Sequence, residues 1–435
     1  MGESMESLYK LMEQDGSFLE QVLAEPALEV AYKNNSVPLK KYLSRHLPRL
    51  LKMAFKEDNE DITLKALKLL TLGSQFVIPN LVKTPFFSEY AKKIISKGNL
   101  SERKIARICD ITISIFRSGS KDAIKGCDYI LQLLSDHCDD LNVYNMFSVL
   151  LSEKEKVEYH REWLFEIGFD NQLANMLQNS LKKNYSMNYS SDQEQIISLL
   201  RMVADAAKRS KMREKFLNGV VFDVLKQVYD LPPLILNYYW EAIDNLYDPE
   251  YFSLFQAHVE SAKSILISKS IDRVYRYHAE ALHFLTKILD LTTNFVNEIF
   301  IKSIINIMLL FNGSSFFLCE SRNFFKKCVK IKDLQEIVIS SVCPVMIHEA
   351  SEKTHGLMPM FAIAIIADFT ETKENDKLIK KINGASSFIR SKLKPYLQKR
   401  DKDFGGDMKQ LQQQSQQQIS VKNTSIWDTP YPLSG

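Results

Sequence analysis

The sequence predicts an all-α protein, folded as an irregular helical-repeat solenoid of the armadillo/HEAT kind. Glycine and proline are scarce, with 14 and 13 among 435 residues, and alternating strand patterns are hard to find. Apolar residues instead recur at helical spacing along almost the whole chain, separated by short polar links. No sequence repeat of fixed length is visible, so we expect an irregular array. A set of compact helical bundles is the alternative architecture.

Two regions are expected from composition. The chain is 45% hydrophobic and 25% charged, which is enough to bury a sizeable core, and we expect residues 1–400 to form one helical-repeat domain. After Asp401 the apolar stripe fades into the glutamine tract "KQLQQQSQQQIS". Such composition cannot bury enough apolar area to offset its ordering entropy. Residues 401–435 are therefore predicted to be a disordered Gln-rich tail, in which Trp427 and Tyr431 are the possible partner anchors.

Spaced apolar residues predict two helices in the middle of the chain. The stretch "DAIKGCDYILQLLSD" carries one helical stripe, and "EQIISLLRMVADAAKRS" carries another over three turns. Ser191 and Glu194 stand three apart before the second stripe, which predicts a capping box that starts this helix. The stripe positions are Ile124, Cys127, Leu131 and Leu134, then Ile196, Leu199, Leu200, Val203, Ala204 and Ala207.

Later helices show equally regular starts and stops. Asp248 is a predicted N-cap, and Pro249 stands at the first helical position, where its missing N–H is not needed. A further stripe runs through "IDRVYRYHAEALHFLTKIL", residues 271–289. We expect helices of about 12–20 residues. Predicted stops are "RSGS" (117–120), "LPP" (231–233), "FNGSS" (311–315) and "KINGASS" (381–387).

Charge and apolar-run length argue against nucleic-acid and membrane partners. There are 56 basic and 53 acidic side chains, a net charge of +3, without the excess typical of a nucleic-acid binder. The longest apolar run, Met360–Ala367, is far shorter than the ~18–20 residues of a membrane span. No apolar signal segment opens the chain. The six scattered cysteines suit reduced thiols in the cytoplasm, and the nucleus is a second expected location.

No catalytic constellation is recognisable, and we expect a protein that is not an enzyme, with no catalytic residue, metal or cofactor. No Gly-rich phosphate loop or HExxH motif is present. His348 and His355 could share a helix face but lack further ligands nearby, so we interpret them as surface histidines. His278 lies on an apolar stripe and is expected in the core. The pair His137–Cys138 is interpreted as a helix end, because adjacent helical residues do not face each other.

Two basic turns are the candidate contacts for an anionic partner. Residues 208–215 contain Lys208, Arg209, Lys211, Arg213 and Lys215, and residues 326–332 contain Lys326, Lys327, Lys330 and Lys332. Either turn could contribute steering toward a partner. Solvated helix ends are the favoured interpretation, because basic residues are common in last helical turns. The sequence leaves the partner-binding face open.

The stretch "LAEPALEVAYKNNSVPLKKYLSRHLPRLLKMAF" resembles the N-terminal signature of the SAPS-domain family, the phosphatase-associated regulatory subunits. In that signature an acidic helix end leads through a short helix and a polar link to two leucine-bearing helices. The apolar stripes of this stretch are expected to face a core, with basic residues such as Lys41 and Arg45 on the solvated side. The corresponding positions are Leu23–Pro26, Ala27–Tyr32, Lys33–Ser36, Leu39–Leu43 with Tyr42 in the aromatic place, and Leu47–Phe55.

The resemblance continues in the same order to about residue 407. "NVYNMFSVLL" and the following "HREWLFEIGFDNQLANML" are similar to the central pattern of the family, with Trp163–Leu164 and Leu173–Leu177 at its positions. "SSDQEQIISLLRMVADAAKRS" looks like the next helix of the same array. The stretches "GLMPMFAIAIIADF" and "SSFIRSKLKPYLQKRDKDFGGDM" resemble its closing part. The matching closing positions are Gly356, Met358, Phe388, Leu393, Arg400 and Phe404–Gly406.

Membership would imply a non-catalytic subunit that binds the catalytic subunit of a type-2A-related serine/threonine phosphatase, of the protein phosphatase 6 class. Such a subunit directs the enzyme to its substrates, often in cell-cycle control and signalling, and works beside further scaffold or substrate proteins. The metals of the reaction then belong to the partner enzyme. The alternative from the residues alone is another helical-repeat adaptor, in transport or vesicle traffic.

Overall fold

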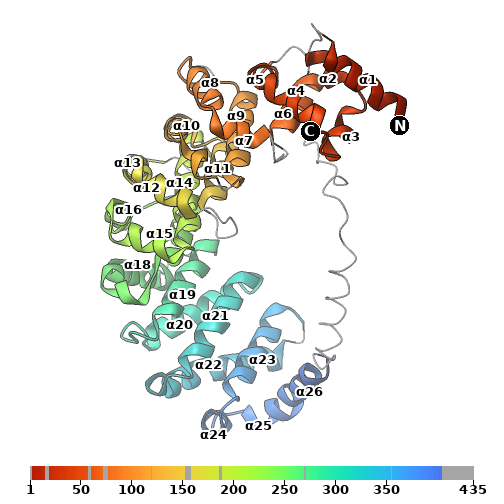
Figure 1. The fold of residues 1–435 in the computed structure, drawn as a ribbon. Coiled ribbons are helices and arrows are strands. Elements are labelled where there is room, and N and C mark those ends of the chain that lie inside the picture. The colour runs from red at the N-terminus through yellow and green to blue at the C-terminus, as the bar shows by residue number, and fades with distance from the viewer. Residues whose placement is uncertain are drawn as a thin grey trace. The chain divides into compact units, whose positions relative to one another are not determined.

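The computed structural model describes residues 2–14, 19–56, 60–71, 77–98, 100–118, 120–151, 158–185, 189–268, 271–353 and 355–403. These residues form helices joined by turns, with no strand among them, which confirms the predicted all-α class (Figure 1). The last helix, α26 (Lys394–Asp403), includes the first three residues of the predicted tail. The rest of that prediction, residues 404–435, lies outside the described residues.

Contacts divide the chain into two compact units, residues 1–261 and 262–435, where one domain over residues 1–400 was expected. The division falls inside α18 (Gln256–Ile267). No helix in the described part of the chain is long and apolar enough to cross a bilayer.

In the first unit, most of the longer helices belong to one of two rows. One row runs α6 (Glu60–Thr71), α9 (Glu102–Arg117), α11 (Leu141–Leu151), α14 (Ser191–Ala207) and α17 (Pro233–Leu246). The other runs α8 (Phe86–Ile95), α10 (Tyr129–His137), α13 (Phe169–Leu181) and α16 (Val220–Leu225), and each helix contacts the next in its row. The short helices α12 (Glu158–Glu166) and α15 (Ser210–Leu217) each precede one helix from each row, which gives the triplets α12–α13–α14 and α15–α16–α17. This arrangement is a helical-repeat solenoid, as expected.

The helices of this unit are α1 (Gly2–Glu13), α2 (Leu19–Ala24), α3 (Leu28–Lys33), α4 (Val37–Arg45), α5 (Leu47–Ala54), α6 (Glu60–Thr71), α7 (Val77–Lys83), α8 (Phe86–Ile95), α9 (Glu102–Arg117), η1 (Lys121–Ile124), α10 (Tyr129–His137), α11 (Leu141–Leu151), α12 (Glu158–Glu166), α13 (Phe169–Leu181), α14 (Ser191–Ala207), α15 (Ser210–Leu217), α16 (Val220–Leu225), α17 (Pro233–Leu246) and η2 (Pro249–Phe255).

The second unit repeats the two-row pattern. Helices α19 (Arg276–Ile288), α21 (Ser315–Cys328) and α23 (Leu357–Phe369) pack in one row, and α20 (Glu298–Leu310), α22 (Lys332–Glu352) and α24 (Lys373–Lys380) pack in the other. Its elements are α19 (Arg276–Ile288), α20 (Glu298–Leu310), α21 (Ser315–Cys328), α22 (Lys332–Glu352), α23 (Leu357–Phe369), α24 (Lys373–Lys380), α25 (Ala385–Phe388), η3 (Ile389–Leu393) and α26. Several helices in both units are shorter than the expected 12–20 residues, because turns interrupt the periodic stretches.

The expected single stripe over residues 122–136 is wrong. Ile124 ends the short helix η1, Cys127 lies in the following turn, and only the residues from Tyr129 onward form α10. The cause is Gly126, whose φ of +74° lies in the left-handed region. A Cβ at this position would also stand 3.1 Å from the Cβ of Ser88. Glycine is therefore needed for the turn.

Two predicted helix starts also differ from the structure. The N-cap of α14 is Ser190, whose hydroxyl accepts the N–H of Gln193, so the capping box expected at Ser191 does not form. The stripe expected from residue 271 becomes helical only at Arg276, where α19 begins. Asp248 is the N-cap of η2 as expected, and its carboxylate accepts the N–H of Glu250.

The N-terminal stretch with the family resemblance is packed as expected. Its helices α3, α4 and α5 bury their apolar stripes, while Lys41 and Arg45 are exposed. The basic residues of this stretch are therefore the solvated face of core helices. The buried residues are Leu39, Tyr42, Leu43, Leu47, Leu50, Leu51 and Ala54.

Candidate functional site

The first basic turn, residues 208–215, joins two helices of the first unit. Lys208 is the C-cap of α14, and Arg209 is the N-cap of α15. Because α15 begins directly at Ser210, these two residues are the whole link between the helices. The remaining residues of the turn lie on α15 itself.

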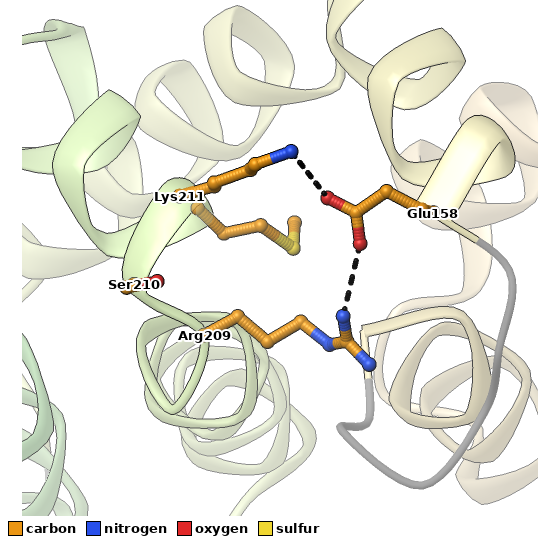
Figure 2. A pocket seen from close by; sticks show the side chains of 5 residues that line it. Glu158, Arg209, Ser210 and Lys211 are labelled. Carbon is orange, nitrogen blue, oxygen red and sulfur yellow. Dashed lines mark hydrogen bonds and ion pairs between the residues drawn. The ribbon is translucent and has the colours of Figure 1, made fainter.

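An open cavity of about 440 Å³ lies at this turn. Figure 2 shows Arg209 and Lys211 reaching toward the carboxylate of Glu158, which comes from the start of α12. Arg209 Nη1 donates to Glu158 Oε2 at 3.1 Å, and Lys211 Nζ lies 3.5 Å from Oε1. One carboxylate is thus held between two cations that stand two residues apart in one turn. The lining residues are Glu158, Arg209, Ser210, Lys211 and Met212.

Arg161 holds the same carboxylate from below the surface. Its side chain is only 3% exposed, and its Nη1 lies 3.4 Å from Glu158 Oε2. Its Nε donates to the carbonyl of Leu150 at 2.8 Å, which fixes the guanidinium in the core. Glu158 therefore has three cations around it: Arg161 is buried, Arg209 is 18% exposed and Lys211 is 72% exposed, while its own side chain is 48% exposed.

The other basic residues of this turn are engaged within the chain. Lys208 Nζ donates to Asp205 Oδ1 at 2.9 Å, and this hydrogen bond raises the pKa of the lysine. Arg213 pairs with Asp248 at 2.9 Å. Lys215 Nζ lies 4.4 Å from the ring centroid of Phe165, a cation–π contact. Only part of the turn, Arg209 with Lys211, therefore faces the cavity.

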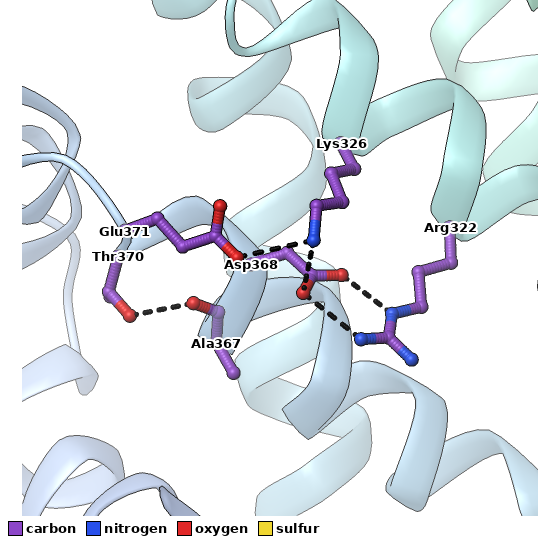
Figure 3. Close-up of polar contacts among 6 residues, drawn as sticks. All are labelled: Arg322, Lys326, Ala367, Asp368, Thr370 and Glu371. Carbon is purple, nitrogen blue, oxygen red and sulfur yellow. Dashed lines mark hydrogen bonds and ion pairs between the residues drawn. The ribbon is translucent and has the colours of Figure 1, made fainter. Parts of the chain in front are cut away.

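The second basic turn, residues 326–332, belongs to an ion-pair cluster of the second unit. In Figure 3, Lys326 and Arg322 converge on Asp368 of α23, and Lys326 also reaches Glu371. Lys327 pairs with Asp290 at 2.7 Å. Lys330 and Lys332 are exposed. The inner half of this turn ties α21 to neighbouring helices, and only its outer half faces solvent.

The histidines are distributed much as expected. His278 is buried, and its Nδ1 accepts the backbone N–H of Tyr275. His348 and His355 are exposed, but His355 lies beyond the end of α22, so the two do not share a helix face. His137 is the last residue of α10, as the helix-end interpretation required. His283 Nδ1 lies 3.0 Å from Glu320.

The cysteines are free thiols, and Cys319 is the exposed one. Burial raises the pKa of Cys138 to about 11, so the thiol is held protonated. No group of three or more histidine, cysteine or acidic side chains that could hold a metal ion occurs in the described ranges.

The sequence did not predict the parts of the cavity contributed by α12. Glu158 belongs to the charged run "SEKEKVE", which has the composition of a solvated helix face. Arg161 follows it, and no sequence pattern distinguishes this arginine from a surface residue. Glu158 and Arg209 are 51 residues apart, and no motif links them. Their meeting depends on the packing of consecutive helix triplets.

Comparison with known proteins supports the fold and no closer assignment. No family model matches the chain, and no curated protein matches it in sequence. The solved structure described as "Crystal structure of Uso1-2" is similar with a TM-score of 0.52 and 10% sequence identity, over 86% of this chain and 71% of that chain. An engineered protein matches over 88% of this chain and 92% of its own at 15% identity, with a TM-score of 0.45. At such identity the likeness to Uso1-2 concerns the fold alone, and that fold is a helical-repeat array.

Proposed function

We propose that this chain is a non-catalytic regulatory subunit that binds the catalytic subunit of a type-2A-related serine/threonine phosphatase, of the protein phosphatase 6 class. In this role it would hold the enzyme and direct it toward substrates. The observation that carries the proposal is the ordered resemblance to the SAPS-domain family, which runs from about residue 20 to about residue 407.

The fold is compatible with this role. A helical-repeat array presents long rows of helices whose outer faces remain available for partners. In the first unit such a row runs from α6 to α17. A rigid array can also hold two bound proteins at a set separation, which raises the effective concentration of one near the other.

Most resemblance positions that the structure describes are core residues. Trp163 and Leu164 are buried in α12, and Met358, Phe388 and Leu393 are buried in the second unit. Substituting these positions would test folding rather than partner binding. The test of function must therefore use the intact chain and its partner.

Reconstitution with a purified phosphatase provides the test. The full chain is mixed with a catalytic subunit of the protein phosphatase 6 class and analysed by size-exclusion chromatography with light scattering. We expect a 1:1 complex, and affinity purification from cells should recover the same catalytic subunit at near-stoichiometric amounts. A type-1 phosphatase catalytic subunit is the matched control and should not co-elute.

The proposal fails if the catalytic subunit elutes separately at micromolar concentration and is absent from the purified material. Recovery of a different, stoichiometric protein in its place would favour the alternative role as a transport or vesicle-traffic adaptor.

A further inference from the structure

We propose that the cavity between α12 and α15 is a binding site for a phosphorylated serine or threonine of a partner protein, and that Glu158 occupies the site when no partner is bound. Glu158 would then act as a resident competitor that the phosphate displaces. This inference does not rest on the proposed phosphatase-binding role, because it concerns only the chemistry of this cavity.

The first argument is that the cavity already holds an oxyanion. Arg209 and Lys211 bind the two oxygens of Glu158 separately, at 3.1 and 3.5 Å. Carboxylate and phosphate oxygens are recognised by the same charged donors, and arginine is especially suited to both. The geometry that receives Glu158 therefore also suits an incoming phosphate.

The second argument is the surplus of donors over acceptors at the lining. Among the described lining residues, Glu158 is the single acidic side chain, against two basic ones. The first turn of α15 lines the same cavity, and its N–H groups have no intrahelical partner. Arg209 at the N-cap supplies no side-chain hydrogen bond to them. These N–H groups carry the partial positive charge of a helix N-terminus, which favours a dianion.

The third argument is that Glu158 can be displaced at low free-energy cost. Its side chain is 48% exposed and that of Lys211 is 72% exposed. The pair with Lys211 is exposed enough to contribute only about 0–1 kcal/mol. The pair with Arg209, whose side chain is 18% exposed, would pass from the carboxylate to the phosphate, whose three acceptor oxygens compete well against one carboxylate. Arg161 remains buried beneath the site and keeps the local potential positive.

The size and composition of the cavity favour a peptide over a lipid headgroup. A volume of about 440 Å³ leaves room beyond the phosphate for the residue that carries it. Met212 supplies an apolar wall and Ser210 a hydroxyl, a mixture suited to a peptide side chain. A membrane surface is recognised instead by clusters of several unpaired basic residues, whereas Lys208 and Arg213 of the same turn are paired with acids.

Fluorescence anisotropy tests the site with the full chain. The probe is a fluorescein-labelled pool of short peptides with degenerate flanks around a fixed central phosphoserine, and a second pool carries serine in its place. We expect saturable binding of the phosphoserine pool, weaker at high salt, and no binding of the serine pool.

Three single variants give opposite expected results. Lys211→Gln and Arg209→Gln should weaken binding about tenfold or more, because each removes a charged donor. Glu158→Gln should strengthen binding several-fold, because it removes the competing carboxylate while keeping the side-chain shape. Lys302→Gln and Glu298→Gln are matched controls, since they alter an exposed ion pair of the second unit by the same charges, and should leave affinity unchanged.

Several results would overturn the inference. One is that neither the wild-type chain nor the Glu158→Gln variant binds the phosphoserine pool saturably. Another is that the Lys211→Gln variant binds this pool as tightly as the wild-type chain does. Equal changes in the control variants would show a nonspecific charge effect and count against the site. The inference would also be contradicted if the chain sedimented with phosphoinositide vesicles and did not bind the phosphoserine pool. Circular dichroism of each variant verifies the fold, and failure of phosphatase binding would leave all these readouts unaffected.

Discussion

Asp368 shows how one buried charge can be stabilised in this fold. Its side chain is 2% exposed, and its two oxygens accept from Arg322 at 2.6 and 3.0 Å and from Lys326 at 3.3 Å. A carboxylate removed from water needs such partners, because an uncompensated buried charge is strongly destabilising. The resulting cluster ties α23 to α21 in the second unit.

Replacing Asp368 with asparagine should therefore destabilise the protein. The amide cannot balance the charge of Arg322, whose side chain is one-third exposed, so we expect a loss of about 1–3 kcal/mol in the free energy of unfolding. Urea unfolding followed by circular dichroism measures the change.

Lys380→Gln is the control for that variant. It breaks an exposed pair with Asp376, one turn away on the same helix, and should change stability by less than about 0.5 kcal/mol. An Asp368→Asn variant as stable as this control would show that the cluster adds nothing.

His258 and His278 make stability depend on pH. Burial lowers the pKa of each imidazole to about 4, well below the usual value of about 6.5. His258 Nε2 lies 3.0 Å from both the hydroxyl of Tyr239 and the carbonyl of Leu225. Its Nδ1 is buried without a hydrogen-bond partner in the described structure, so a second ring proton would find no acceptor there.

We therefore expect stability to fall as pH falls from 6.5 toward 4. In this window the unfolded chain binds protons that the folded chain does not, which favours unfolding. Each histidine should account for about 2 kcal/mol of the loss between pH 7 and pH 5. Urea unfolding at both pH values should show this part of the loss removed in His258→Gln and His278→Gln.

The exposed His355 provides the comparison. His355→Gln should reproduce the wild-type pH dependence. If all three variants showed the same slope as the wild type, carboxylates rather than buried imidazoles would control acid stability.

At the level of elements, helix starts depend on single hydroxyl groups. Ser190 and Ser191 are neighbours, yet only Ser190 has the extended backbone, with φ −145° and ψ 162°, that lets its hydroxyl cap α14. Ser191 Oγ instead donates to Asp139 at 2.7 Å, in an exposed position. The two serines are chemically equal in the sequence, so only their conformation separates their roles.

Ser190→Ala should reduce stability by about 0.5–2 kcal/mol through loss of the cap. Ser191→Ala should have the smaller effect, because its hydrogen bond is exposed to water. Chemical unfolding of the two variants side by side gives the comparison. If Ser191→Ala were the more destabilising variant, the result would favour the capping box that the sequence predicted at Ser191.

Local chemistry predicted some element boundaries and missed others. Asp248 with Pro249 was recognisable because cap and first-turn preferences act within a few residues. The break at Gly126 was missed, since an apolar stripe continues through it and a glycine in a helical pattern does not by itself reveal a left-handed backbone. The delayed start of α19 at Arg276 shows the same limit.

At the scale of the whole molecule, contacts in each unit run between neighbouring helices of the array. In such arrays stability is approximately a sum of local terms, so damage in one unit need not reach the other. The two tryptophans among the described residues, Trp163 and Trp240, both lie in the first unit and report on it by fluorescence. The third, Trp427, can be replaced by phenylalanine.

In a Trp427→Phe background, Asp368→Asn should therefore shift the unfolding midpoint seen by circular dichroism. The tryptophan fluorescence transition, by contrast, should stay within about 0.5 kcal/mol of its parent. Equal shifts of both signals would instead show that the chain unfolds in one cooperative transition.

The cavity at α15 was only half visible in the sequence. Its basic side came from one turn, residues 208–215, where clustered Lys and Arg are easy to see. Its acidic side, Glu158, lies on another helix, and a charged residue in a charged run carries no sign of a distant partner. Which basic residues face the cavity was equally hidden, because Arg213 and Asp248 pair elsewhere.

The sequence by itself determined the all-α class, the helical-repeat character and the buried faces of helices such as α4, α5 and α14, because hydrophobic periodicity acts within a few turns. Tertiary structure alone decided the division into two units, the cap of α14, and the meeting of Glu158 with Arg209 and Lys211. The division and the meeting of Glu158 with the two cations depend on contacts between residues far apart in the chain, and local patterns carry no record of such contacts. The cap depends on the backbone conformation of Ser190, which its chemically equal neighbour Ser191 does not share.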